Sequence, residues 1–229
     1  MRWDTIAEIN FSCRRHTMER VDDLIHGVVL RGAQTPMPIN LLDISPGLIF
    51  ETEDFSLRAF QVEHRGSASL GFRFDEFPRR PFLPEKAEAL GVNPGPWRKD
   101  LVAGKAITLP DGRVIEPDQV LGPEKAGTSL VVVGDVGKPE RLLEQVRGAD
   151  ALVIEATYLN EEADMAKEFG HTTAGAVAEL AKRAGVGQLI LTHVSRRYSD
   201  EDILAEACAI FPNTALARDF DAFVIRREE

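Results

Sequence analysis

Three short apolar segments in the second half of the sequence constrain its fold most strongly. SLVVV, ALVIE and QLILT occupy residues 129–133, 151–155 and 188–192, and their length and content of β-branched residues favour buried strands. Helical patterns lie between them, in PERLLEQVRG (139–148) and TAGAVAELAKRAG (173–185). Strands that alternate with helices are typical of an α/β protein in which helices cover a sheet.

The rest of the chain predicts mainly short strands. Residues 78–128 hold most of the 13 prolines, and they predict a short helix at 84–91 and a hairpin at 109–115. The other expected elements are strands at 5–13, 39–44, 47–54, 55–64, 68–77 and 221–227, and helices at 15–32 and 200–211.

The composition limits the classes of protein to which the chain can belong. With 229 residues, 44% of them hydrophobic and 28% charged, it fits one globular domain over residues 1–229. No apolar run approaches the roughly 18 residues of a membrane span, and the first residues lack the apolar core of a signal peptide, so we expect no membrane partner. The two cysteines lie far apart in the sequence and suggest no disulfide framework, which predicts a cytoplasmic location.

The charge distribution is compatible with nucleic-acid binding only at locally basic sites. A formal net charge of −10 argues against indiscriminate binding of nucleic acids, which usually needs a basic surface. A locally basic groove is compatible with the sequence, because basic residues occur in pairs at Arg14 and Arg15, Arg79 and Arg80, Arg98 and Lys99, and Arg196 and Arg197.

Several predicted strands end in side chains that can bind a metal ion. His64 follows FQVE, Asp135 follows VVVG, and His193 follows LILT. Glu155 ends another strand, and His171 lies in the loop GHTTA just before a predicted helix. A sheet holds ligands at the ends of its strands rigidly, and imidazole and carboxylate groups suit zinc.

Each of these residues also has a purely structural explanation. A histidine at a strand end is often only hydrogen-bonded, and Asp135 could cap the helix that follows it. Glu155 could pair with a neighbouring base, His171 could belong to a helix-capping loop, and the Arg196–Arg197 pair could face solvent. The residues taken alone leave both readings open.

The order of five motifs narrows this choice. FQVEHRG, GDVG, IEATYL, FGHTTA and LTHVSRRY, in this order, resemble the ribonuclease Z family of tRNA 3′-processing endonucleases. The resemblance implies a metallo-β-lactamase fold, an αββα sandwich, with zinc bound by His64, Asp135 and His193. It also implies that Glu155 and His171 act together beside the leaving group.

The same resemblance implies how precursor tRNA binds. The segment from about residue 79 to 108 is similar to the protruding arm with which the family grips tRNA, and the family forms homodimers. The residues that the resemblance places against the substrate are Gly95, Pro96, Arg98, Lys99, Thr173, Arg196, Arg197 and Tyr198.

One family motif is missing from the sequence. The family begins with HxHxDH, which supplies most ligands of one zinc ion, whereas the five histidines here are His16, His26, His64, His171 and His193. We therefore expect an N-terminally truncated chain or a late start of the reading frame, with one zinc ion or none. Little endonuclease activity is expected from this polypeptide alone.

Two other readings share the same motifs. A metallo-β-lactamase-fold hydrolase of small phosphodiesters or esters would use the same ligands without needing the arm. A non-catalytic subunit completed by a partner would explain the missing ligands. A haloacid-dehalogenase-like phosphatase is excluded, because its DxDx nucleophile motif is absent near the first strand.

Overall fold

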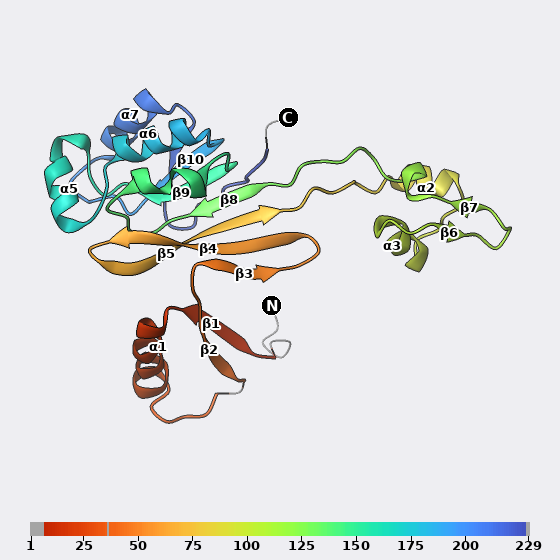
Figure 1. The fold of residues 1–229 in the computed structure, drawn as a ribbon, viewed down its shortest axis with the longest axis horizontal. Coiled ribbons are helices and arrows are strands. Elements are labelled where there is room, and N and C mark those ends of the chain that lie inside the picture. Colours follow the sequence, from red (N-terminus) through yellow and green to blue (C-terminus); the bar gives the residue numbers. More distant parts are fainter. Residues whose placement is uncertain (1–6, 36, 228–229) are drawn as a thin grey trace.

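A seven-stranded mixed sheet forms the centre of the structure, a computed structural model that describes residues 7–35 and 37–227 (Figure 1). The strands lie in the order β11, β10, β9, β8, β5, β4, β3. β8 to β11 are parallel, and β5 joins them to an antiparallel half made of β3, β4 and β5. Their bounds are β3 Gly47–Glu51, β4 Phe55–His64, β5 Ser67–Glu76, β8 Ser129–Val132, β9 Ala151–Glu155, β10 Gln188–Thr192 and β11 Thr214–Leu216.

Helices lie along one side of the parallel half of the sheet (Figure 1). They are α4 (Leu143–Val146), α5 (Ala163–Phe169), α6 (Ala174–Ala184) and α7 (Asp200–Ile210). The main core lies between them and the sheet, where Leu152, Leu189 and Leu191 are completely buried against Val177 and Ile203. Burying one such side chain contributes about 1.5–3 kcal/mol, so this layer explains why the apolar runs are strands. Among the described residues, no helix has the length and apolar character needed to cross a membrane.

A long hairpin brings the antiparallel half to the same edge of the sheet. β4 and β5 pair along ten residues each, from Phe55 opposite Glu76 to His64 opposite Ser67. The two turn residues, Arg65 and Gly66, have φ values of 47° and 72°, as a tight hairpin turn requires. Because β4 runs in the same direction as β8, His64 lies at the edge where the parallel strands end.

The first described residues form a small unit beside the main sheet (Figure 1). β1 (Ile9–Cys13) pairs in parallel with β2 (Ile39–Asp43). Between them, α1 (Arg15–Asp22) continues directly into a π-helix, η2 (Asp23–Val29), where the sequence predicts one helix. The part of the predicted first strand before residue 7 lies outside the described residues.

Residues 79–125 form an arm that projects away from the sheet (Figure 1). It contains α2 (Pro84–Ala89), α3 (Pro96–Val102), β6 (Ile107–Thr108) and β7 (Val114–Ile115). β-Bridges from Arg79 to Lys125 and from Phe82 to Leu121 close its base. The arm extends beyond the expected boundary at residue 108, because Ile115, Val120 and Leu121 complete a small core with Ala87, Val92, Leu101, Ile107 and Leu109.

The strand predicted at residues 221–227 is wrong. The edge strand is β11, which follows α7 closely and pairs with Leu189–Leu191 of β10. Residues 221–227 form no strand, and Phe223 and Val224 are 37% and 73% exposed. Within the part of the chain that the structure describes, no strand pairs with this apolar segment. Helices α3 and α5 are additional elements that the sequence patterns did not predict.

Because the arm has a core of its own, we expect that a substitution in that core destabilises the arm without destabilising the sheet. Leu101 is completely buried within that core, so Leu101→Ala should destabilise the arm by about 2–5 kcal/mol through lost burial and a cavity. Hydrogen exchange should therefore accelerate in residues 79–125 and stay slow in β8, β9 and β10. The neighbouring Val102 is 54% exposed, and Val102→Ala is the control, with an expected effect within about 0.5 kcal/mol. Equal acceleration in the sheet would contradict the independence of the two cores.

Candidate active site and metal centre

The polar side chains at the strand ends gather at one edge of the sheet. His64 ends β4, Asp135 follows β8, Glu155 ends β9, and His193 follows β10. His171 comes from the loop before α6, and its ring centroid lies 5.0 Å from that of His64 and 5.3 Å from that of His193. The sheet therefore brings together residues that are up to 129 positions apart in the sequence.

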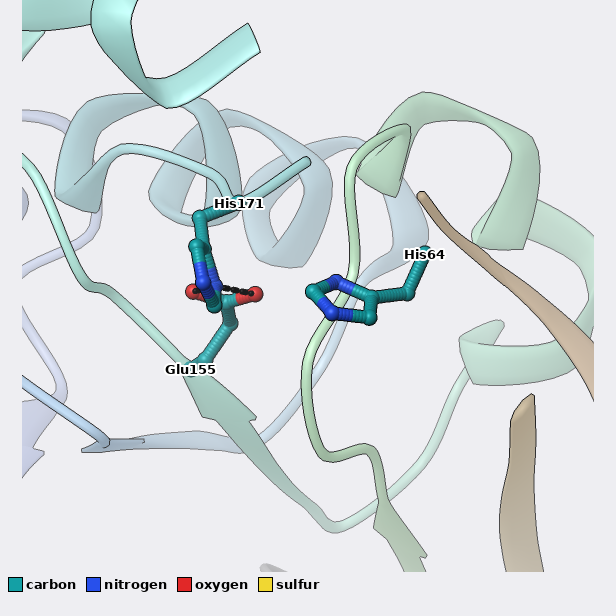
Figure 2. Close-up of side chains that lie close together, drawn as sticks. All are labelled: His64, Glu155 and His171. Carbon is teal, nitrogen blue, oxygen red and sulfur yellow. Dashed lines mark hydrogen bonds and ion pairs between the residues drawn. The ribbon is translucent and has the colours of Figure 1, made fainter. Parts of the chain in front are cut away.

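Glu155 is completely buried beneath this group. Its Oε1 accepts a hydrogen bond of 2.6 Å from the backbone N–H of Val136, and Thr157 donates its hydroxyl hydrogen to Oε2. His171 Nδ1 lies 3.0 Å from both carboxylate oxygens, and Figure 2 shows this ring against the carboxylate with His64 facing the pair. Three donors compensate for the burial of this carboxylate, which would otherwise be strongly unfavourable.

Asp135 lies between two imidazoles. Its Oδ2 is 3.8 Å from His64 Nε2, and its Oδ1 is 3.7 Å from His193 Nδ1. Within residues 7–35 and 37–227, no hydrogen-bond donor reaches this carboxylate at normal hydrogen-bond distance. Its side chain is 39% exposed, so the carboxylate is accessible from the solvent side of the site.

The histidine environments fit a metal ion. His64 Nδ1 lies 2.8 Å from the Gly170 carbonyl oxygen, which can only accept, so this nitrogen carries the hydrogen and Nε2 keeps its lone pair. Metal-binding histidines commonly have such an acceptor on the nitrogen that does not bind the metal. Two triads have ligand atoms within 4.8 Å of one another: His64, Glu155 and His171, and Asp135, His171 and His193. The expected ligands are divided between these triads: His64 belongs to the first, and Asp135 and His193 belong to the second. Asp135 lies next to both histidines, and imidazole and carboxylate are donor types that zinc accepts.

A hollow of about 400 Å³ lies beside His64 and Asp135. Its other walls are mostly small or polar and come largely from β1, α1 and β5, which carry no family motif. Apart from Arg14, sequence reasoning did not identify them. They include Ser12, Arg14, Thr17, Ser67 and Ser69. The volume is within the range of small-molecule pockets, so it can accept a group about the size of a nucleotide.

Several residues expected to contact the substrate also make contacts within the protein. Thr173 is only 4% exposed; its hydroxyl donates to Asn160 Oδ1 at 2.6 Å and accepts from the Ala176 N–H at 3.1 Å. Thr173 therefore caps α6, and its expected contact with the substrate stays a prediction. Arg98 donates to the Val92 carbonyl oxygen at 2.9 Å and lies over the Phe82 ring, so it stabilises the arm from within.

The basic residues after His193 differ from one another. Arg197 Nη1 lies 3.1 Å from Glu162 Oε1, and the Tyr198 hydroxyl donates to the other oxygen of Glu162. Arg196 is exposed and makes no side-chain hydrogen bond or ion pair in the part of the chain that the structure describes. Of these three residues, Arg196 is the one whose charge is available to a phosphate.

In the arm, the Gly-Pro pair begins α3. Gly95 has φ 156°, a conformation that favours glycine, and Pro96 takes the first turn of the helix, where its missing N–H is tolerated. Lys99 is exposed on α3, and Trp97 is 37% exposed beside it. These residues lie far from the histidines, at the opposite end of the molecule (Figure 1).

Comparisons with known proteins agree with this arrangement. A protein-family model described as "Beta-lactamase superfamily domain" matches residues 118–194. Ribonuclease Z of a Bradyrhizobium strain is 46% identical over 192 residues, which are 84% of this chain and 64% of that protein. Ribonuclease Z of Geobacillus kaustophilus is 40% identical over 205 residues, 87% of this chain and 66% of that protein. The chain thus spans about 64–66% of the length of these curated relatives.

Solved structures confirm the predicted fold. The metallo-beta-lactamase fold protein YhfI from Bacillus subtilis has a TM-score of 0.57 at 13% identity, over 91% of this chain and 61% of that one. Human tRNase Z, short form, has a TM-score of 0.55 at 21% identity, over 97% of this chain and 70% of that one. The chain therefore has the metallo-β-lactamase fold, and over most of its length its sequence is similar to ribonuclease Z.

Proposed function

We propose that this chain carries the chemistry of a ribonuclease Z-type endoribonuclease, which removes 3′ trailers from precursor tRNA. The observation that carries the proposal is the 46% identity to a ribonuclease Z over 84% of this chain, together with the cluster of His64, Asp135, Glu155, His171 and His193. A homodimer and a cytoplasmic location remain predictions.

The superfamily is metal-dependent, and we propose zinc as the ion. His64, Asp135 and His193 would hold it, because Asp135 Oδ2 lies 3.8 Å from His64 Nε2, and Asp135 and His193 belong to one triad of ligand atoms within 4.8 Å of one another. A zinc ion bound there supplies a Lewis acid for the scissile phosphate and for the attacking water. With one carboxylate and two imidazoles, these residues can hold one ion.

His171 would donate the proton to the departing 3′ oxygen. Glu155 accepts a hydrogen bond from His171 Nδ1, which directs Nε2 of the same ring away from the buried carboxylate. The donors on Glu155 keep this carboxylate in place, so the ring orientation is fixed before the substrate binds. Arg196 is available to neutralise a phosphate oxygen near the cut.

The arm would bind the body of the tRNA. Residues 79–125 contain eight Lys and Arg against seven Asp and Glu, whereas the whole chain has a formal net charge of −10. The arm is therefore the less repulsive part of the molecule for RNA. Lys86, Lys99, Lys105 and Trp97 are exposed on it. Contacts to phosphates position an RNA without reading its sequence, so recognition would depend on the shape of tRNA.

Metal binding is the first test of the proposed centre. His193→Ala should lower the affinity for zinc or cobalt by about 100-fold or more, since even outer partners of a ligand typically change affinity about 10–100-fold. The measurement is isothermal titration calorimetry on metal-free protein. His26→Ala is the control, because His26 is exposed and pairs with Asp22 outside the candidate site. Equal affinities of the two variants would exclude His193 as a ligand.

Proton donation is tested in a chimera that joins this chain to an amino-terminal segment carrying the HxHxDH motif of the family. There His171→Ala should lower the rate of precursor tRNA cleavage by about 10²–10⁴-fold, because the general acid is lost. The affinity for the precursor should change little. Cleavage at the unmutated rate would show that His171 is not the proton donor.

The arm distinguishes a tRNA enzyme from a hydrolase of small phosphodiesters. In the same chimera, residues 80–124 are replaced by a short Gly-Ser linker; removing only 80–108 would leave half of the arm core exposed. Binding of precursor tRNA should weaken by more than about 10-fold, because the phosphate contacts of the arm are lost. Hydrolysis of bis(p-nitrophenyl) phosphate should persist. Unchanged tRNA cleavage would favour the small-substrate reading.

A further inference from the structure

Thr157 occupies a position between the two histidines of the site and the buried carboxylate. It follows β9 by two residues, is 8% exposed, and belongs to none of the predicted ligand or catalytic groups. Its Oγ1 lies 2.8 Å from His193 Nδ1 and 3.0 Å from the His193 carbonyl oxygen. The same oxygen is hydrogen-bonded to Glu155 Oε2.

The direction of these hydrogen bonds follows from counting hydrogens. A threonine hydroxyl has one hydrogen to donate and two lone pairs that accept. The Glu155 carboxylate and the His193 carbonyl can only accept, so they take the hydroxyl hydrogen of Thr157. Towards the His193 ring, Oγ1 can then only accept, which requires that Nδ1 carry the hydrogen.

A hydrogen on Nδ1 leaves Nε2 of His193 with a free lone pair. A free neutral histidine favours the opposite tautomer, with the hydrogen on Nε2, so the Nδ1–H form needs an acceptor to stabilise it. His64 has the Gly170 carbonyl oxygen at 2.8 Å, and His171 has the Glu155 carboxylate at 3.0 Å. For His193, Thr157 Oγ1 is the closest acceptor to Nδ1, because Asp135 Oδ1 is 3.7 Å away.

The backbone of His193 depends on the same contact. His193 has φ 52°, a left-handed conformation that is rare for residues with a side chain and costs about 1–3 kcal/mol. Thr157 touches both the ring and the carbonyl group of this residue, and its own carbonyl oxygen accepts from the Ser195 N–H at 3.2 Å. The loops after β9 and β10 are therefore tied together around His193.

We propose that Thr157 is a positioning residue that fixes His193 in the Nδ1–H tautomer and so presents Nε2 to a metal ion. The hydroxyl also joins His193 to Glu155, so that one buried carboxylate orients His171 directly and His193 through Thr157. The inference rests on the proposed function only in taking His193 as a ligand. The tautomer itself is a property of the metal-free chain and does not depend on a bound ion.

The tautomer is measured by two-bond ¹H–¹⁵N spectra of the metal-free chain with ¹⁵N-labelled histidine in alkaline buffer. His193→Gln identifies the His193 signals by their loss. In the wild-type chain, His193 should carry its hydrogen on Nδ1, and Thr157→Ser should keep it there. Thr157→Val should move it toward Nε2. A wild-type His193 with the hydrogen on Nε2 would overturn the proposal, whatever the variants do.

Metal affinity provides the second readout. Thr157→Val should weaken zinc binding by about 10–100-fold, the usual effect of losing a partner of a metal-binding histidine. Thr157→Ser should stay within a few-fold of the wild type, because it retains the hydroxyl. Thr214→Val is the matched control: it removes another partly buried hydroxyl of the sheet, which donates to the Phe211 carbonyl oxygen at 2.5 Å.

The outcomes separate this proposal from the proposed function. If Thr157→Ser binds zinc as weakly as Thr157→Val, or if Thr157→Val binds like the wild type, Thr157 does not act through its hydroxyl. Either result leaves the cleavage test of His171→Ala unaffected, since neither measurement uses RNA. A loss of cleavage in His171→Ala together with an unchanged His193 tautomer in Thr157→Val would reject only the role of Thr157.

Discussion

The hydrogen bonds of the buried Glu155 carboxylate are the interactions on which the rest of the site depends. No part of Glu155 is exposed, and a carboxylate in such a place is stable only when its oxygens are hydrogen-bonded. The donors come from three separate loops: the Val136 N–H after β8, Thr157 after β9 and His171 before α6. Removing the carboxylate would leave these groups without their common partner, so one side chain determines how three loops approach one another.

The sheet determines where these loops meet. β8, β9 and β10 are parallel, so their carboxyl ends lie at one edge, which is where open α/β sheets usually bind ligands. β4 reaches the same edge through two antiparallel pairings and supplies His64. Gly137 and Gly170 pass within van der Waals contact there, and a Cβ on Gly137 would lie 3.1 Å from the Gly170 carbonyl oxygen. That carbonyl is the acceptor for His64 Nδ1, so close backbone packing also orients a candidate ligand.

The sequence predicts the buried strands well because they depend on local patterns, and it also places the candidate ligands at the ends of these strands. Apolar runs of four or five residues predict β8, β9 and β10, and the polar residue after each run lies at the edge of the sheet. Interactions between distant residues are invisible to such patterns. Thr173 and Arg98 resemble substrate contacts in sequence, but their roles depend on Asn160 and on Val92 with Phe82. The apolar 221–227 segment looks like a strand, yet whether it becomes one depends on finding a partner.

Two connecting segments that are hydrogen-bonded to each other lead from the sheet to the arm, which has a core of its own. Arg79 and Lys125 exchange two backbone hydrogen bonds of 2.9 and 2.8 Å, and the Glu76 N–H donates to the Thr128 carbonyl oxygen at 2.9 Å. Gly127 passes so close to Glu76 that a Cβ would lie 1.9 Å from its carbonyl oxygen, so only glycine fits there without a backbone shift.

These contacts pair the two connecting segments at the base of the arm. Paired segments resist bending more than single chains do, so the arm is held in a preferred direction while its own core remains separate from the main one. The distance from the α3 surface to the histidines then depends mainly on the length of the paired segments. If the arm binds tRNA as proposed, the length of the paired segments would set the distance between the bound part of the tRNA and the histidines. This gives a physical basis for selecting a substrate by its shape without reading its bases.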